Sequence, residues 1–391
     1  MKEPALKEFL PFAKPEFTPE TIAEVSQCLE SGWITTGPRV KKFEELLKRY
    51  HQAPHAITVA SATAGLHVAL LALDLQPEDE VITTSFTFVA TLNTIVLAGA
   101  KPVLVDVDPL TYNLDLNLLE KAITKNTKAI VPVHFAGAPV DMDHLYAIAR
   151  KHNLRIIEDA AHAIGTEYKG KKIGSFGDTQ VFSFHPNKNM TTGEGGCVLT
   201  SDETLAKKVT SLKFHGIDRE AWNRFSKEGS QFYDVIAPGF KYNMTDMSAA
   251  LGIHQLPHLD TFIEKRTKIA HTYEHAFKGW DELIVRKSPT YSHRHAWNLF
   301  NVLINPQATK ITRDEFVQLL KEENIGTGVH WQVPHLFSFY KETYGYKKGD
   351  FPHSEFIADH VVSLPLFPGL TADQQNIIIH TIGKIFGKTV S

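Results

Sequence analysis

The sequence predicts an α/β protein whose large domain contains a mostly parallel sheet covered by helices on both faces, followed by a smaller α+β domain. From about residue 56 to 215, short runs of β-branched and apolar residues alternate with helical patterns. This alternation is typical of parallel strands joined by crossover helices. The chain of 391 residues is too long for one small core and fits a large domain with a second, smaller one.

The elements of the large domain are expected in the following order. An arm of about 17 residues contains several prolines, and a helix that Thr18 can cap follows it and runs to residue 30. Helical patterns between the strands include residues 64–73 and 142–152. The candidate strands are residues 56–59, 81–84, 102–106, 129–133 and 154–158. Ligands of such sheets bind at the carboxyl ends of the strands, so residues that follow these strands are candidate site residues.

The rest of the chain is expected to form the smaller domain, so that the two domains span residues 1–255 and 256–391. The sequence predicts a strand over 298–304, a helix over 313–323 and a further strand over 327–331. The last helix opens with Thr371 and Gln374 in a capping-box pattern and runs to about residue 386.

Composition excludes several functional classes. The net charge of -3 gives no electrostatic case for nucleic acid or an anionic membrane as a partner. The only cysteines are Cys28 and Cys197, which argues against a disulfide scaffold and a cysteine zinc site, and the histidines show no HExxH spacing, so we expect no metal. The N-terminus lacks the apolar core of a signal peptide and no long uncharged apolar run follows, so a cytoplasmic protein is expected.

Lys188 and Asp159 are the most informative residues. Lys188 follows an apolar, β-prone stretch and precedes the glycines of 193–196. An amine that is partly desolvated in such a place has a lowered pKa and can act as a Schiff-base nucleophile. Asp159 ends an apolar strand. Each has a simpler interpretation by itself, as a solvated lysine or a capping aspartate, but together they are the pair that pyridoxal phosphate (PLP) enzymes need.

The turn of residues 61–65 is a candidate anion site. It leads into an apolar-rich helix, and the backbone N–H groups of Ala62 and Thr63 would lie at the start of that helix, where an anion is stabilised. The alternative is that Thr63 serves only as an N-cap.

The chain resembles the PLP-dependent sugar aminotransferases of the DegT/DnrJ/EryC1/StrS type, which install an amino group on nucleotide-linked keto sugars. The matching segments are residues 32–38, 61–67, 158–162, 183–196 and 241–246, in the order of the family. Within the family the chain is most similar to the branch that forms UDP-4-amino-4-deoxy-L-arabinose with glutamate as amino donor. The resemblance implies PLP-transferase fold type I, which is aspartate-aminotransferase-like and has a seven-stranded sheet.

The resemblance also implies roles for individual residues. Lys188 would hold PLP covalently and move the proton at the substrate carbon, and Asp159 would face the pyridine nitrogen. Asn243 would reach the cofactor phosphate of a neighbouring subunit, which implies a homodimer with shared active sites; many members carry arginine at the position of Thr245, two residues later. The other cofactor-binding residues implied are Ala62, Thr63 and Ser183 at the phosphate, Phe88 stacked on the ring, and His162 near the phenolic oxygen.

Substrate contacts are expected from His330 and Arg219. For Arg219, a solvated arginine in a loop is an equally good interpretation. The expected reaction is ping-pong: L-glutamate gives up its amino group and leaves as 2-oxoglutarate, and a nucleotide-diphosphate keto sugar accepts the group. Three functions stay open. The first is amination of a UDP-4-keto-pentose for lipid A and lipopolysaccharide modification. The second is amination of a UDP- or dTDP-4-keto-6-deoxyhexose for an O-antigen or another glycan. The third is a PLP-binding regulator without turnover.

Overall fold

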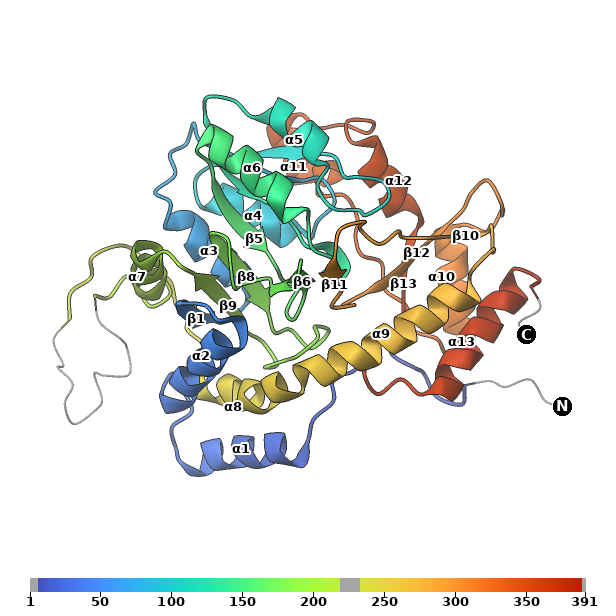
Figure 1. Cartoon of the computed structure of the whole chain (residues 1–391), viewed down its shortest axis with the longest axis horizontal. Coiled ribbons are helices and arrows are strands. Elements are labelled where there is room, and N and C mark those ends of the chain that lie inside the picture. Colours follow the sequence, from blue (N-terminus) through green and yellow to red (C-terminus); the bar gives the residue numbers. More distant parts are fainter. Residues whose placement is uncertain (1–5, 219–232, 389–391) are drawn as a thin grey trace.

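The structure is a computed structural model, and it describes residues 6–218 and 233–388. Figure 1 shows a large part built around a central sheet and a smaller part beside it, with the long helix α9 (Leu259–Ala276) running from one to the other. The predicted α/β fold class is confirmed by a seven-stranded sheet in the large part. Arg219, which the sequence suggested as a substrate contact, lies outside the described residues.

The secondary structure follows the expected order closely. The remaining helices are α1 (Pro19–Glu30), α2 (Pro38–His51), α3 (Ala62–Leu71), α4 (Val89–Leu97), α5 (Leu116–Ala122), α6 (Met142–His152), α7 (Glu203–Leu212), α8 (Asp246–Gln255), α10 (Arg313–Glu322), α11 (Ser338–Tyr344), α12 (Pro352–His360) and α13 (Ala372–Ile385), with the short 3-10 turns η1 (Phe135–Gly137), η3 (Leu256–His258) and η4 (Pro334–Leu336). The strands are β1 (His55–Val59), β2 (Glu80–Thr84), β3 (Lys101–Val105), β4 (Thr127–Val131), β5 (Arg155–Asp159), β6 (Glu167–Tyr168), β7 (Lys171–Lys172), β8 (Thr179–Ser183), β9 (Gly196–Thr200), β10 (Leu283–Val285), β11 (His293–Arg294), β12 (Phe300–Ile304) and β13 (Val361–Leu364).

The large sheet is mostly parallel, with the strand order β1-β9-β8-β5-β4-β2-β3. Neighbours from β8 to β3 pair in parallel, whereas β9 is antiparallel to both β1 and β8. The loop that carries Lys188 connects β8 to β9, so β9 brings the chain back along β8 directly after this loop. The parallel arrangement places the carboxyl ends of β2, β4, β5 and β8 at one edge of the sheet, where a ligand site is expected.

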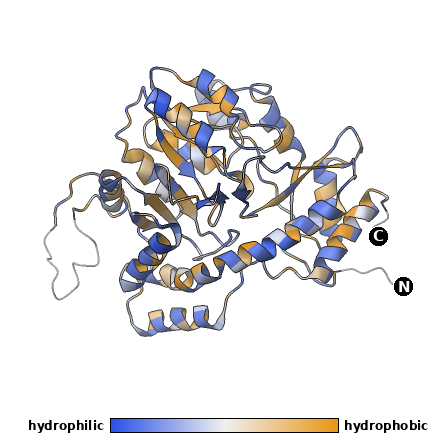
Figure 2. Ribbon diagram, in the orientation of Figure 1, coloured by the Kyte–Doolittle hydropathy of each residue, from blue (hydrophilic) through white to orange (hydrophobic). Residues whose placement is uncertain are grey.

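Alternate residues of each central strand face two different helix layers. On β5, Ile156 packs in a cluster with residues of α2, α6 and α8, whereas Ile157 packs in a second cluster with residues of α3, α4 and α7. This alternation is the period of two that a strand buried on both faces requires. Figure 2 shows hydrophilic and hydrophobic residues mixed along the helices, as expected for helices with one face against the sheet.

The smaller part has its own sheet and core. Its antiparallel sheet has the order β10-β12-β13, and Phe300 and Ile378 belong to a buried cluster between this sheet, α10, α13 and the second half of α9. Along α9, Ile263 still packs in the core of the large part and Ile269 in that of the small part. The domain boundary between residues 255 and 256 stays a prediction. The change from packing against the core of the large part to packing against the core of the small part occurs slightly later, within α9.

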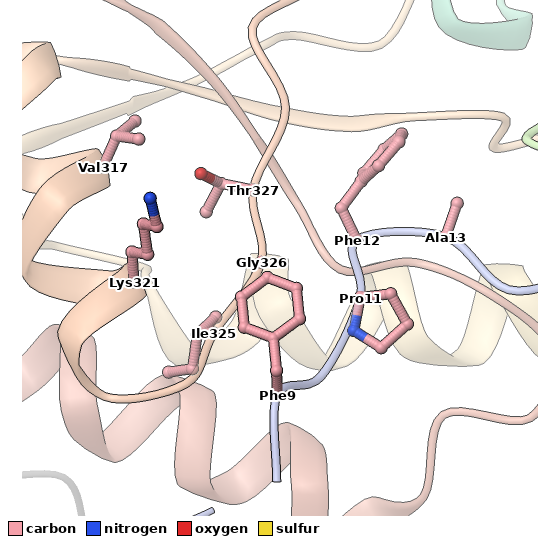
Figure 3. A pocket seen from close by; sticks show the side chains of 9 residues that line it. All are labelled: Phe9, Pro11, Phe12, Ala13, Val317, Lys321, Ile325, Gly326 and Thr327. Atoms are coloured by element: carbon pink, nitrogen blue, oxygen red, sulfur yellow. The ribbon is translucent and has the colours of Figure 1, made fainter.

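The N-terminal arm lies against the small part, where residues 9–13 run beside residues 325–327 (Figure 3). Leu10 pairs in parallel with Ile325, with the Leu10 N–H donating to Asn324 O at 2.9 Å and the Gly326 N–H donating to Leu10 O at 2.8 Å. Gly326 is required at this approach, because a Cβ there would lie 2.7 Å from Leu10 O. Two residues further on, the ring of Phe12 lies 5.2 Å from the ring of His330.

Two helix ends confirm their predicted caps, and one predicted strand is wrong. The Thr18 hydroxyl accepts from the Thr21 N–H, and Thr371 with Gln374 forms a complete capping box. Residues 327–331 were expected to be a strand, but only Gly328 pairs, in an isolated bridge to Ser363 on β13. After this single pair the chain leaves the sheet and turns toward the cavity described below. None of the helices within the described residues is long and apolar enough to span a membrane.

Candidate active site

A cavity of about 290 Å³ lies at the carboxyl edge of the large sheet. Its wall combines the start of α3, the turn before α4, the ends of β5 and β8, the loop after β8 and the segment at residue 330. All the residues predicted for the site, other than Asn243 and Arg219, line it: Ala62, Thr63, Phe88, Asp159, His162, Ser183, Lys188 and His330.

Lys188 is partly buried and carries a perturbed amine. Burial lowers the pKa of Lys188 to about 8, and the carboxylate of Asp159 opposes this shift only in part. A much larger fraction of the amine is therefore neutral near pH 8 than for a solvated lysine. The neutral form is the nucleophile, so the local environment prepares Lys188 for attack on a carbonyl.

Asp159 faces the same cavity with its side chain nearly covered, at 6% exposure. Burial raises the pKa of this carboxyl, and the hydrogen bonds from Thr91 and Ala161 oppose that rise. The Thr91 hydroxyl donates to Oδ2 at 2.8 Å and the Ala161 N–H donates to Oδ1 at 3.2 Å. Both of these donors are neutral, so a cationic nitrogen of a ligand would stabilise the buried carboxylate further.

His162 is held as a neutral imidazole. Its Nδ1 accepts from the Ala136 N–H at 3.3 Å, which leaves the proton of the neutral ring on Nε2. Burial, with a smaller contribution from the charge of Lys188, holds the pKa of His162 well below its usual value. The ring stacks on Trp331 with 5.0 Å between centroids and 28° between planes.

His330 is also neutral, and a hydrogen bond from Ser363 orients its ring. The amide of Asn301 donates to Ser363 Oγ at 2.8 Å, so the Ser363 hydroxyl is free to donate to Nδ1 of His330, also at 2.8 Å. This arrangement places the proton of the neutral ring on Nε2. Burial and then the charge of Lys188 lower the pKa of His330 to about 4. His162 and His330 therefore each offer one N–H donor.

The start of α3 has the form of an anion site. Ser61, rather than Thr63, is the N-cap, since its hydroxyl accepts from the Ala64 N–H at 3.1 Å. The interpretation of Thr63 as the cap is thus wrong, because Thr63 is the second residue of the helix, two positions after the cap. The N–H groups of the first turn have no acceptor within the helix and point toward an anion at its end. Gly196 lets this helix start approach β9, since a Cβ there would lie 2.7 Å from the Ala62 nitrogen.

Phe88 and Ser183 complete the walls. Phe88 directly precedes α4 and is 54% exposed, although it is a large apolar residue on the cavity wall. An exposed ring at such a place is available to stack on a planar ligand. Ser183 is buried at the end of β8 and also lines the cavity.

Asn243 does not line this cavity. Its amide donates to Thr36 Oγ1 at 2.5 Å, its Oδ1 is buried without a hydrogen-bond partner, and it borders a separate hollow of about 710 Å³. Thr245, which stands where many family members have arginine, caps α8 by accepting from the Ser248 N–H. One chain therefore does not bring Asn243 to its own Lys188.

Several wall residues were missed at the level of sequence. Trp331 follows His330 directly but was assigned to a strand that does not form. Thr91, which does not line the cavity but donates to Asp159, was also missed; it lies on α4 three residues after Phe88, the N-cap of that helix. His185, Asn187 and Glu194 also line the cavity. Within the described ranges, no cluster of three or more His, Cys, Asp or Glu side chains could hold a metal ion.

The residues present fit PLP on three observations. The lowered pKa of Lys188 suits attachment of an aldehyde. The covered carboxyl of Asp159 lacks a charged hydrogen-bond donor and suits a ring nitrogen. The start of α3 suits a phosphate. Together with the fold, this site defines a PLP-dependent enzyme.

Comparison with known proteins identifies the family. The model of the DegT/DnrJ/EryC1/StrS aminotransferase family matches residues 15–383, so the chain belongs to this family, and its cofactor is pyridoxal 5′-phosphate. The chain is 49% identical over 381 residues to the uncharacterized protein MJ1066 of Methanocaldococcus jannaschii, covering 97% of this chain and 98% of that one. It is 44% identical over 381 residues to the spore coat polysaccharide biosynthesis protein SpsC of Bacillus subtilis, covering 96% and 97%.

Solved structures agree with this result. The PLP form of the putative sugar aminotransferase Spr1654 from Streptococcus pneumoniae is 32% identical, with a TM-score of 0.89, covering 98% of this chain and all of that one. Helicobacter pylori PseC, an aminotransferase involved in the biosynthesis of pseudoaminic acid, is 29% identical with a TM-score of 0.89, covering 97% of this chain and 100% of that one. Both likenesses extend over the whole length of the chain.

Proposed function

We propose that the protein transfers the amino group of L-glutamate to a 4-keto sugar linked to a nucleotide diphosphate, with Lys188 as the catalytic residue. The observation that carries this proposal is that Lys188 and Asp159 share one cavity and have oppositely shifted pKa values, lowered for the amine and raised for the carboxyl. This is the environment that a covalently held PLP requires.

When bound, PLP supplies an electron sink for the charge that develops at the reacting carbon. The residues of the chain would divide the remaining tasks. The start of α3 and Ser183 would bind the phosphate, Phe88 would support the ring, and Asp159 would keep the ring nitrogen protonated.

Lys188 would move the proton at the substrate carbon. Its pKa of about 8 lets it both accept and give a proton near neutral pH. His162 and His330, both neutral with Nε2–H groups, would donate hydrogen bonds without adding a positive charge that repels the protonated amine. We place the Nε2–H of His162 at the phenolic oxygen of the cofactor and that of His330 at the sugar.

The size of the cavity limits what it can contain. Its volume of about 290 Å³ is at the lower end of the range of roughly 300–1,000 Å³ for ligand pockets. The cofactor and the reacting end of the sugar would fill it, so the nucleotide would extend outside. We propose that a second copy of the chain borders that space and supplies Asn243, which does not line the cavity of its own chain.

Two sugar classes remain candidates. A UDP-4-keto-pentose, giving UDP-4-amino-4-deoxy-L-arabinose for lipid A modification, is the one favoured by resemblance to that branch of the family. A UDP- or dTDP-4-keto-6-deoxyhexose for a glycan is the second candidate. The names of SpsC, a spore coat polysaccharide biosynthesis protein, and of PseC, an aminotransferase involved in pseudoaminic acid biosynthesis, support a role in making a glycan sugar without naming its nucleotide. Both classes would use the same cofactor and the same lysine.

The test is to incubate the purified protein with PLP, L-glutamate and a panel of UDP- and dTDP-4-keto sugars, and to detect products by mass. Amination of the pentose alone supports the lipid A pathway, and amination of a deoxyhexose alone supports the glycan pathway. The Lys188→Ala variant is the control, and unchanged turnover by it would overturn the proposal. If glutamate leaves the absorbance of the bound cofactor unchanged, the protein is instead a PLP-binding regulator.

A further inference from the structure

The loop that carries Lys188 is closed at its base by its own hydrogen bonds. It leaves β8 at Phe184, and the Thr192 N–H donates back to Phe184 O at 3.0 Å. The Lys188 N–H donates to His185 O at 2.9 Å, which forms a turn. These bonds close the loop, but they do not by themselves fix its tip relative to Asp159 on β5.

The tip is held by a segment more than 100 residues away in the sequence. The amide of Asn298 donates to Asn187 O at 3.1 Å and to Asn189 Oδ1 at 3.2 Å, and the amide of Asn189 donates to Ala296 O at 2.5 Å. Asn189 and Asn298 are 3% and 2% exposed. Both neighbours of Lys188 in the chain are therefore bonded to the segment 296–298.

This segment is itself anchored on two sides. On the side of the large sheet, the Ala296 N–H donates to Gly137 O at 3.0 Å and the Asn298 N–H donates to Ala136 O at 2.9 Å. Gly137 has φ +97°, and a Cβ on it would lie 3.1 Å from the Ala296 Cβ, so a side chain there would disturb this contact.

On the other side, Nη1 of the buried Arg266 on α9 donates to Trp297 O at 3.3 Å, Asn298 O at 3.4 Å and Leu366 O at 2.8 Å. The segment continues into β12, the central strand of the small sheet. The tip of the Lys188 loop is thus tied to the place where the two parts of the molecule meet.

We propose that Asn298 is a positioning residue: through Asn187 and Asn189 it holds the Lys188 loop so that the amine stays in the cavity beside Asp159. The proposal rests on the proposed role of Lys188. Packing alone would not require an amide at position 298. The Oδ1 atom of Asn298 is buried without a hydrogen-bond partner, and burying an unsatisfied oxygen is unfavourable. The two N–H groups of the amide explain its presence, because they bond on both sides of the lysine.

The test uses the full-length protein with the change Asn298→Asp, which keeps the shape and replaces the N–H donors by an acceptor. Gln375→Glu is the matched control, because Gln375 is also buried and its amide donates to a backbone carbonyl, Ile269 O, at 2.7 Å far from the cavity. The first readout is amide hydrogen exchange of residues 184–192 in the cofactor-free protein. We expect faster exchange in Asn298→Asp and unchanged exchange in the control.

The second readout is the pH dependence of the rate at which the cofactor-free protein attaches PLP. With the loop released, the midpoint should move upward from about 8 toward the ordinary lysine value of about 10.4. At pH 7 the attachment rate should fall by about tenfold or more, because fewer amines are neutral. Because the new carboxylate of Asn298→Asp would itself raise the pKa of a nearby amine, the same shift of the midpoint is required in Asn189→Ala, which adds no charge. A role in packing alone would leave the midpoint of Asn189→Ala in place.

Asn189→Ala removes the other half of the amide pair and gives the same two readouts if Asn298→Asp does not fold. Wild-type exchange and a wild-type midpoint in a folded variant would overturn the proposal. This result differs from failure of the proposed function, in which the wild-type protein would attach PLP at a lysine other than Lys188 or would aminate no keto sugar.

Discussion

The imidazole of His162 stacks on the indole of Trp331, with 5.0 Å between the ring centroids and 28° between the planes. His162 follows β5 of the large sheet, whereas Trp331 belongs to the segment that follows α10 in the small part. The ring of Phe88 lies 6.2 Å from the same indole. Trp331 therefore joins two walls of the cavity that come from distant parts of the sequence.

The first prediction concerns this contact. Trp331→Leu should leave the fold intact but weaken PLP binding about tenfold, because an aromatic pair contributes about 0.5–1.5 kcal/mol beyond its buried area. Titration of the cofactor-free protein with PLP, followed by absorbance, measures the change. Trp280→Leu is the control, since Trp280 packs in the core of the small part. Equal weakening by both changes would contradict a specific role for Trp331.

The second prediction concerns the charge of Asp159. Asp159→Asn keeps the shape but removes the negative charge that would keep the ring nitrogen protonated, so kcat should fall by about 10²-fold or more. Thr91→Val removes one of the hydrogen bonds that oppose the raised pKa of Asp159, and should lower kcat by about tenfold or less. Steady-state kinetics with glutamate check both. A larger effect of Thr91→Val than of Asp159→Asn would contradict this order.

The third prediction concerns stability and pH. Because burial lowers the pKa of Lys188 to about 8, the unfolded chain binds this proton more tightly than the folded one. The charged lysine thus destabilises the cofactor-free fold below pH 8, and this penalty disappears as the pH rises from about 8 toward 10.4. Lys188→Met should raise the free energy of unfolding at pH 7 by about 1–3 kcal/mol, after allowance for partial exposure.

Urea denaturation at pH 7 and pH 10 measures this difference, which should shrink at the higher pH. Lys213→Met is the contrasting variant, because Lys213 is buried with partners, namely Glu44 at 3.3 Å and Thr58 O at 3.0 Å. Removing Lys213 should destabilise the protein. An equal loss of stability in both variants would show that Lys188 is not held unfavourably in the folded state.

The fourth prediction concerns the hydrogen bond behind His330. Ser363→Ala removes the donor to Nδ1, so the ring no longer keeps its proton on Nε2 at all times. We expect KM for the keto sugar to rise about threefold to tenfold, with little change in KM for glutamate or in PLP binding. Ser363→Thr keeps the hydroxyl and should restore part of the affinity. A change in PLP binding of the same size would place His330 at the cofactor instead.

The features that could be predicted from the sequence are the strands, helix caps and loop motifs that residues close together in the sequence determine. Ile156 and Ile157 alternate between two cores, so β5 is visible as an apolar run, and the polar residue at its end is a site candidate. Thr371 and Gln374 cap α13 because a capping box needs only residues three apart. Lys188 is recognisable because a strand, a lysine and a glycine cluster follow one another.

The parts that could not be predicted depend on contacts between distant residues. Residues 327–331 have the composition of a strand, but only Gly328 finds a partner, Ser363 on β13, before the chain turns toward the cavity. The bond between Ser363 and His330 joins residues 33 positions apart, and that between Asn298 and Asn187 joins residues 111 apart. Neither pair has a local signal, because spacing in the sequence does not determine which strand ends meet.

The most direct test of the account is to locate the cofactor on the chain. The PLP-loaded protein is treated with borohydride, digested, and examined by mass spectrometry for the peptide that carries the reduced cofactor. The account predicts a single modified site at Lys188, lost in Lys188→Ala and displaced by prior incubation with glutamate. Modification at another lysine, or none that glutamate displaces, would contradict the assignment of this cavity as the active site.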